Sequence, residues 1–233
     1  MAPLRVFTNW NLRPSDELTQ IEPYRRYFMI CEGENTEKWY FERLISERKT
    51  LNINSNIDVR FVERSGDELH QSNPVKLIEH GKKIMGDESS GYEEGDVIVL
   101  VFDVDIYKPN KLEELQNVIN AANDNGFWVG ITNPSFELFL LLHIEDAYSK
   151  YILPNATAIM EKKNRRAARS NIQKLLTECV KMNPKTNKNI GSLATRIDIA
   201  IEQEQFINRE LDCCMEKITS NIGKIIEKIR EAH

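Results

Sequence analysis

The sequence predicts an α/β fold, with a mostly parallel sheet flanked by helices and a helical region at the C-terminal end. Short apolar runs of strand length alternate with segments of helical period four times before about residue 150. Beyond Pro154 only helical periods remain. Alternation of strand and helix is typical of a parallel sheet covered on both faces. We therefore expect a polar arm at 1–23, an α/β core at 24–150 and a helical region at 151–233 packed on the core.

The first half of the core contains two strand–helix pairs. Residues 27–31 form a continuous apolar run, as a strand buried on both faces does. A helix begins near Thr36, whose hydroxyl group suits an N-cap. Residues 57–62 alternate between apolar and polar side chains, which predicts a second strand. Pro74 is placed to open the second helix.

The second half of the core repeats the pattern twice. Residues 97–102 read V-I-V-L-V-F and give the clearest strand in the chain. An amphipathic helix follows over 112–122 and ends at Gly126. Residues 127–131 predict the fourth strand, and Asn133-Pro134 open a helix that we expect to continue to about His143, with that histidine in the core or at a cap.

An apolar stripe at gaps near three and four predicts the core face of a C-terminal helix. A partner-binding surface is the alternative that the pattern leaves open. The stripe consists of Ile207, Leu211, Ile218, Ile222, Ile225 and Ile229.

Charge and cysteine usage indicate the class of protein. The net charge of −5 excludes nucleic-acid binding by overall attraction, but it leaves room for a local basic stripe. The four cysteines have neither metal-ligand nor disulfide spacing, so we expect reduced thiols and a cytoplasmic protein. No apolar signal segment opens the sequence, and the longest apolar run, 136–144, is too short to span a membrane.

One basic cluster stands out between the predicted helices of the C-terminal region. On a helix its side chains would cover a broad face suited to phosphate contacts. A solvated helix face is the alternative reading of such a charge run. The cluster consists of Lys162, Lys163, Arg165, Arg166 and Arg169.

Acidic and polar side chains follow three of the predicted strands. The carboxyl ends of parallel strands lie at one edge of a sheet, where ligands bind, so we expect these residues to meet there. Glu32 follows the first strand, Asp103 and Asp105 the third, and Asn133, Ser135 and Glu137 the fourth.

Crowded carboxylates repel one another, and a divalent cation removes that conflict. Hard oxygen ligands suit Mg²⁺, or Mn²⁺ in its place, working on substrate phosphates. Asp103 and Asp105 fit this role because alternate residues of an extended chain point to one side. Glu137 lies in a helix that is apolar on every side, where a carboxylate must be neutralised, hydrogen-bonded or bound to metal. A paired core glutamate, a simple turn at Gly33 and plain loop chemistry for the two aspartates remain open.

Three motifs in register resemble the RloB-like family over residues 26–145. They are E-G-E-N-T-E at 32–37, F-D-V-D at 102–105 and N-P-S-F-E-L-F-L-L-L-H at 133–143. Phe139 stands where the family usually has tryptophan, and the C-terminal half matches only loosely.

The resemblance implies a fold of the TOPRIM superfamily, which topoisomerases, primases and OLD-type nucleases share. Glu32 would be the TOPRIM glutamate, Asp103 and Asp105 the D-x-D pair of that fold, and Glu137 an additional acid of the family; all four would bind Mg²⁺ and act in catalysis. A lysine between the later helices would neutralise charge on the reacting phosphate; Lys188 is our candidate, with Lys185 left open. The remaining motif residues would support the site: Gly33, Glu37, Asn133 and Ser135.

The resemblance also implies a bacterial anti-phage nuclease that cleaves DNA or RNA, such as tRNA, and is controlled by an ABC-type ATPase partner. A non-catalytic, metal-binding regulatory subunit of such an ATPase is the alternative. A phosphohydrolase of the haloacid-dehalogenase type fits less well, because its Asp-x-Asp lies on the first strand, whereas Asp103 follows the third. No Gly-x-Gly-x-x-Gly follows any strand, which argues against dinucleotide binding. Nothing in the sequence excludes a homo-oligomer.

Overall fold

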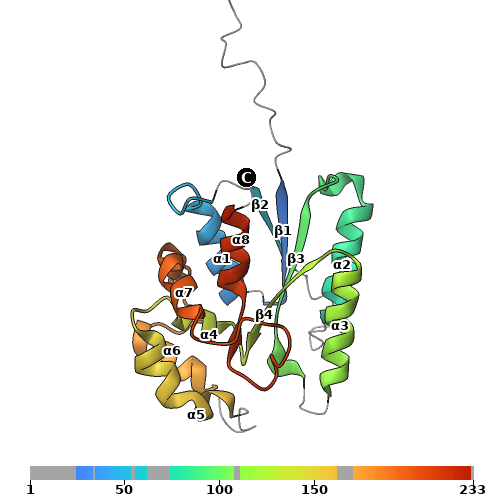
Figure 1. Cartoon of the computed structure of the whole chain (residues 1–233). Helices are drawn as coiled ribbons and strands as arrows, with labels where there is room; N and C mark the ends of the chain where they lie inside the picture. The colour runs from blue at the N-terminus through green and yellow to red at the C-terminus, as the bar shows by residue number, and fades with distance from the viewer. Residues whose placement is uncertain are drawn as a thin grey trace, which may run out of the picture.

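The molecule is a central sheet with helices on both faces (Figure 1), which confirms the predicted α/β class. The computed structural model describes residues 25–33, 35–53, 56–61, 74–107, 111–161 and 170–231, with the side chains of 56–61 and Ile106 excepted. The strands lie in the order β2-β1-β3-β4-β5; the first four are parallel, and β5 is antiparallel at the edge. Their bounds are β1 (Arg26–Cys31), β2 (Asn56–Phe61), β3 (Val97–Asp103), β4 (Trp128–Asn133) and β5 (Thr219–Ser220).

The helices of the core fall where the sequence predicts them, with shifted ends. The helix α4 ends at Leu141 and does not reach His143. Thr36 is the first residue of α1 and not its N-cap, which is Asn35. The helices are α1 (Thr36–Ser46), α2 (Pro74–Gly86), α3 (Leu112–Asp124), α4 (Phe136–Leu141), α5 (Ala156–Met160), α6 (Asn171–Val180), α7 (Ile197–Glu204) and α8 (Ile222–Glu231). Shorter 3₁₀ or π turns are η3 (Glu88–Ser90), η4 (Val104–Ile106), η6 (Tyr148–Ile152), η7 (Leu153–Asn155) and η8 (Lys188–Arg196).

Two hydrophobic cores cover the two faces of the sheet. In β1, Tyr27 and Met29 belong to one core, and Phe28 and Ile30 to the other, because successive side chains of a strand point to opposite faces. The first core packs under α1, α4, α6, α7 and α8, and the second under α2 and α3 (Figure 1). A strand buried on both faces explains the unbroken apolar runs of the sequence.

The C-terminal region is helical, as predicted, except for one strand of two residues. Its strand β5 pairs with the end of β4. Asn221 anchors β5: its Oδ1 accepts from the Ile131 backbone N–H at 2.7 Å, and its Nδ2 donates to the Val129 carbonyl at 2.8 Å. A strand of two residues is too short to produce a period-two pattern, so the sequence did not predict it.

The predicted C-terminal stripe is core-facing, but it does not lie on one helix. Ile222, Ile225 and Ile229 are buried on α8. Ile207 and the Ile218 side chain pack against the same core from the segment between α7 and α8. The helical spacing of these residues therefore arises from two separate segments of the chain and not from one continuous helix.

Two predicted features lie outside the described residues: the polar arm at 1–23 and the basic cluster at 162–169. Every helix within the described ranges is too short or too polar to cross a lipid bilayer.

The contact between α1 and η8 is unusually close. Gly191 lies against the Trp39 backbone, so that a Cβ there would overlap the Trp39 carbonyl oxygen. At the start of α1, Thr36 Oγ1 donates to the Pro184 carbonyl at 3.0 Å. These two contacts fix the chain on either side of Lys185 and Lys188.

We expect Gly191→Ala to lower the free energy of unfolding by about 1–3 kcal/mol, because α1 and η8 must separate to admit the methyl group. Gly86→Ala is the matched control: Gly86 is exposed, and a Cβ there meets nothing within 4 Å. Urea unfolding of both variants measures the difference. Equal stability of the two would show that α1 and η8 are not tightly packed in solution.

Candidate active site

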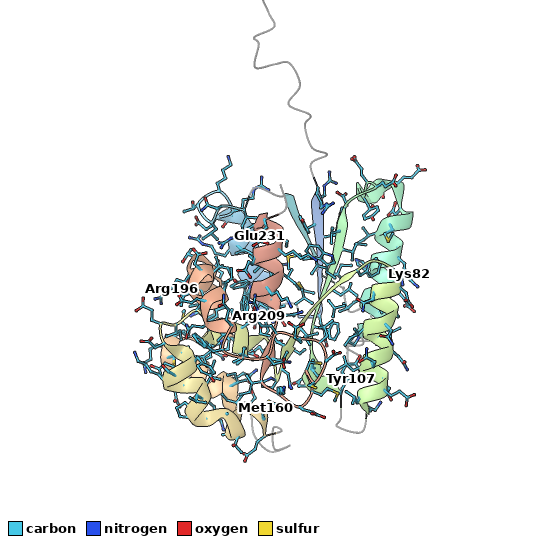
Figure 2. The ribbon with its side chains drawn as sticks, viewed as in Figure 1. Lys82, Tyr107, Met160, Arg196, Arg209 and Glu231 are labelled. Carbon is cyan, nitrogen blue, oxygen red and sulfur yellow. The ribbon has the colours of Figure 1, made fainter. Side chains whose placement is uncertain are left out.

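A cavity of about 510 Å³ opens at the carboxyl edge of the parallel strands. Its walls come from the end of β3 and η4, the connection from β4 to α4, the end of α5 and the start of α6. Figure 2 labels two of its lining residues, Tyr107 and Met160, at the lower end of the molecule. The structure therefore brings the third and fourth strand ends to one cavity, as expected for an open parallel sheet.

Glu137 is the most deeply placed acid of the cavity, with a side chain that is 0% exposed. It accepts hydrogen bonds from Ser135 Oγ at 2.6 Å and Gln173 Nε2 at 3.1 Å, and Lys185 Nζ lies 2.7 Å from its Oε1. Burial alone would raise its pKa, but the Lys185 ammonium and these hydrogen bonds lower the pKa below its ordinary value. Glu137 is thus held as a charged, paired carboxylate.

Lys185 is the one lysine that the described residues bring to the acids. Burial would lower its pKa, yet Glu137, Glu37 and Asp103 together raise the pKa above its ordinary value. Lys188, three residues on, lines a different hollow with Trp39. Of the two lysines that the sequence left open, the geometry favours Lys185.

Asp103 ends β3 and lies beside Thr132 of β4, whose Oγ1 donates to Asp103 Oδ1 at 2.5 Å. Burial raises the pKa of Asp103 well above its ordinary value, and the charges of Glu37, Asp105 and Glu137 raise it further. Asp105 lies in η4, because the chain turns directly after the strand. It is more exposed than Asp103, but it lines the same cavity.

Glu37, predicted only as a supporting residue, lies among the carboxylates. Burial raises its pKa, Lys185 lowers it, and the charges of Glu137 and Glu32 raise it, with a raised pKa as the result. Gly33 allows this position, since a Cβ at Gly33 would overlap the Glu37 carboxyl group. Glu32 is close enough to act on the pKa of both Glu37 and Tyr107; burial and Glu32 raise that of Tyr107 to about 12.

Asn133 and Ser135 have separate supporting roles. Asn133 Nδ2 donates to the carbonyls of Cys214 and Lys217 at 2.8 and 3.0 Å, which ties the segment between α7 and α8 to the end of β4. Ser135 binds Glu137 directly. Asn133 therefore shapes the cavity wall without touching the carboxylates in any hydrogen bond within the described ranges.

Two partners of the site carried no clear signal in the sequence. Gln173 belongs to a capping box with Ser170 at the start of α6, a local pattern that gives no hint of its bond to Glu137. Thr132 is a polar residue inside a strand, and only the register of β3 against β4 places it beside Asp103.

His143 lies in the core, as the sequence indicated. Its Nε2 is 3.0 Å from Tyr40 Oη, and its Nδ1 is 2.9 Å from the Phe139 carbonyl oxygen. Burial lowers its pKa to about 4. All four cysteines are free thiols, and Cys31 and Cys214 are buried.

The chemistry of the donor set fits a hard divalent cation. Five carboxylates share one ammonium group, Lys185, and repulsion among them helps to raise the pKa of Asp103 and Glu37. Within the described ranges, however, no three His, Cys, Asp or Glu side chains converge closely enough to hold a metal ion in this arrangement. The five are Glu32, Glu37, Asp103, Asp105 and Glu137.

Comparison with known proteins identifies the family. A family model described as RloB-like protein matches residues 27–229. The match runs from β1 to α8 and so extends well beyond the motifs at 26–145, through the region where the sequence resembles the family only loosely. Neither a curated protein nor a solved structure matches the chain. The match includes every residue of the cavity described above, and the chain belongs to the RloB-like family.

Proposed function

We propose that this RloB-like protein is a metal-dependent nuclease that hydrolyses phosphodiester bonds of DNA or RNA. One observation carries the proposal: Asp103, Asp105 and Glu137 line a cavity at the carboxyl edge of the sheet with Lys185, and the charge of Glu37 beside them helps to raise the pKa of Asp103. An excess of buried negative charge is costly unless a cation is bound there. Mg²⁺ or Mn²⁺ is the class of cation that such oxygen ligands suit.

Glu32, Asp103, Asp105 and Glu137 would hold the metal, with Glu37 beside them. When bound, Mg²⁺ supplies an activated water and neutralises charge on the phosphate oxygens. Lys185 is the group of this chain that can stabilise charge developing on the phosphate, because its ammonium already lies among the acids. Ser135 and Gln173 orient Glu137, and Thr132 orients Asp103.

The basic cluster at 162–169 remains our prediction for a phosphate-binding segment. It lies outside the described residues, but the residues on either side of it, Glu161 and Ser170, both line the cavity. A role in anti-phage defence and control by a partner ATPase are further proposals, and they follow from membership of the RloB-like family.

We expect Asp103→Asn to abolish metal-dependent cleavage and to weaken Mn²⁺ binding while the protein stays folded. Asp124→Asn is the matched control, since Asp124 is exposed at the end of α3 that leads back to the opposite edge of the sheet. Cleavage of plasmid DNA, single-stranded DNA and total tRNA with Mg²⁺, Mn²⁺ or EDTA measures activity, and calorimetry measures Mn²⁺ binding.

Cleavage that persists in a folded Asp103→Asn protein would contradict the assignment. Metal binding without cleavage of any nucleic acid, alone or with the neighbouring ATPase, would favour the regulatory subunit.

Lysine substitutions separate the two candidates left open by the sequence. We expect Lys185→Gln to lower the cleavage rate by about a hundredfold or more, because a positive charge is removed from the reacting centre. Lys188→Gln should leave the rate near the wild-type value, since Lys188 lines another hollow. Rates are measured in single turnover at saturating Mg²⁺, with circular dichroism to confirm folding. A large loss of rate in Lys188→Gln and none in Lys185→Gln would instead assign the catalytic role to Lys188.

The crowded carboxylates also predict how stability depends on pH without metal. An acid whose folded pKa is raised binds its proton more tightly in the folded state, so the free energy of unfolding falls as pH rises above about 4 toward the raised pKa. We expect Asp103→Asn to make this decline shallower in EDTA, and Asp124→Asn to leave it unchanged. Urea unfolding across pH 4 to 8 is the measurement. A slope that does not change in Asp103→Asn would mean that its carboxyl group is not crowded in solution.

A further inference from the structure

A stacked aromatic pair, the partly buried Tyr148 and the exposed Phe206, lies beside the candidate active site. Phe206 is 60% exposed and Leu153 58%, the two most exposed large apolar side chains of the described residues. Both line one hollow of about 440 Å³, together with Tyr148. Exposed apolar side chains gathered in one hollow mark a binding surface more often than scattered ones do.

The pair is rigidly held. The rings of Tyr148 and Phe206 are stacked, with centroids 5.3 Å apart and planes at 21°. Buried Gln203 fixes both residues: its Oε1 accepts from the Tyr148 backbone N–H at 2.9 Å, and its backbone carbonyl accepts from the Phe206 N–H at 3.1 Å. The Gln203 side-chain amide also donates to the Leu142 and Ile144 carbonyls, directly after α4. The aromatic surface is therefore preformed, and binding a flat ligand needs little ordering.

The hollow adjoins the carboxylate cavity. Met160 and Glu216 line both. Figure 1 shows the segment between α7 and α8 crossing the lower end of the sheet near α5, and α5 supplies Met160. A ligand that fills both would place one part at the acids and the next part over Phe206.

We propose that Tyr148 and Phe206 form a stacking site for one unpaired nucleobase next to the phosphodiester bond at the carboxylates. The inference rests on the proposed nuclease function and adds a substrate class, a single-stranded or looped nucleic acid. A base inside a duplex has neighbours on both faces, so it can reach an aromatic surface only when it is unpaired and unstacked. The exposed Lys217 lines the same hollow and suits an adjoining phosphate.

Stacking also suits an acidic protein. The exposed Phe206 ring binds any base through its face, independently of sequence and with little dependence on charge. An apolar side chain of a protein partner, or of a second copy of this chain, could also cover the Phe206 ring. The experiment below distinguishes these two occupants from a nucleobase.

The test uses the full chain with Asp103→Asn, so that bound nucleic acid is not cleaved. Fluorescent single-stranded DNA and RNA oligonucleotides, and the duplexes of the same sequence, are the probes, with binding measured by anisotropy in Mg²⁺. We expect Phe206→Ala to weaken single-strand binding about tenfold and to leave duplex binding unchanged. Phe206→Trp should retain single-strand binding. Met85→Ala is the matched control, since Met85 is another exposed apolar residue. It should change neither single-strand nor duplex binding.

Photocrosslinking locates the bound base independently of affinity. An oligonucleotide that carries 5-iodouracil should crosslink to Tyr148 or Phe206, identified by mass spectrometry of the peptides. The proposal is overturned if the crosslink lies elsewhere, if Phe206→Ala weakens both probes equally or neither, or if Phe206→Ala instead dissociates a dimer or releases a protein partner.

The two proposals fail separately. Single-strand binding that depends on Phe206, without metal-dependent cleavage by the wild-type chain, would keep the stacking site and remove the nuclease. Cleavage that requires Asp103, together with nucleic-acid binding that Phe206→Ala does not change, would keep the nuclease and remove the stacking site.

Discussion

The buried carboxylate of Glu137 is the constraint on which the rest of the site depends. A charged group at 0% exposure is costly unless partners compensate it, and each partner here comes from a different part of the chain. Ser135 is local, Gln173 comes from α6, and Lys185 comes from the segment before η8. Satisfying one charge therefore requires the C-terminal region to dock on the α/β core. The cavity is therefore complete only when the C-terminal region is docked on the core.

The remaining acids make the opposite contribution. Lys185 compensates Glu137, but burial and mutual repulsion leave Asp103 and Glu37 with raised pKa values. A fold selected for stability alone would not gather these groups, because like charges in a partly buried cavity oppose one another. Sites where local rules are broken in this way are more often functional than structural. The excess of negative charge is therefore not explained by anything the fold requires, and the metal ion of the proposed function would compensate it.

What the sequence could predict depends on the range of the interactions involved. The strands and the acids that follow them were predictable, because hydrophobic period and strand polarity are local properties. The position of Lys185 was not, since Thr36 and Gly191 set it through contacts with Pro184 and Trp39 that no local pattern encodes. The strand β5 could not be predicted for a similar reason: two residues carry no period, and their pairing with β4 and the bonds of Asn221 to β4 are long-range contacts. Glu37 can lie among the carboxylates because Gly33 has no side chain. The sequence suggested a turn or a supporting role for Gly33, but not this contact.

Under the proposed function, an acidic protein acts on a polyanion and must overcome repulsion at its own active site. The chain has a net charge of −5, and Asp103, Asp105 and Glu137 line its cavity with Lys185. A divalent cation reverses the sign of the field at the phosphate, but it does so at one point only. Affinity for the rest of the ligand must then come from interactions that an acidic surface does not weaken. Stacking of a base on Phe206 is such an interaction. The preformed pair of Tyr148 and Phe206, in the hollow next to the carboxylate cavity, is well placed to provide it.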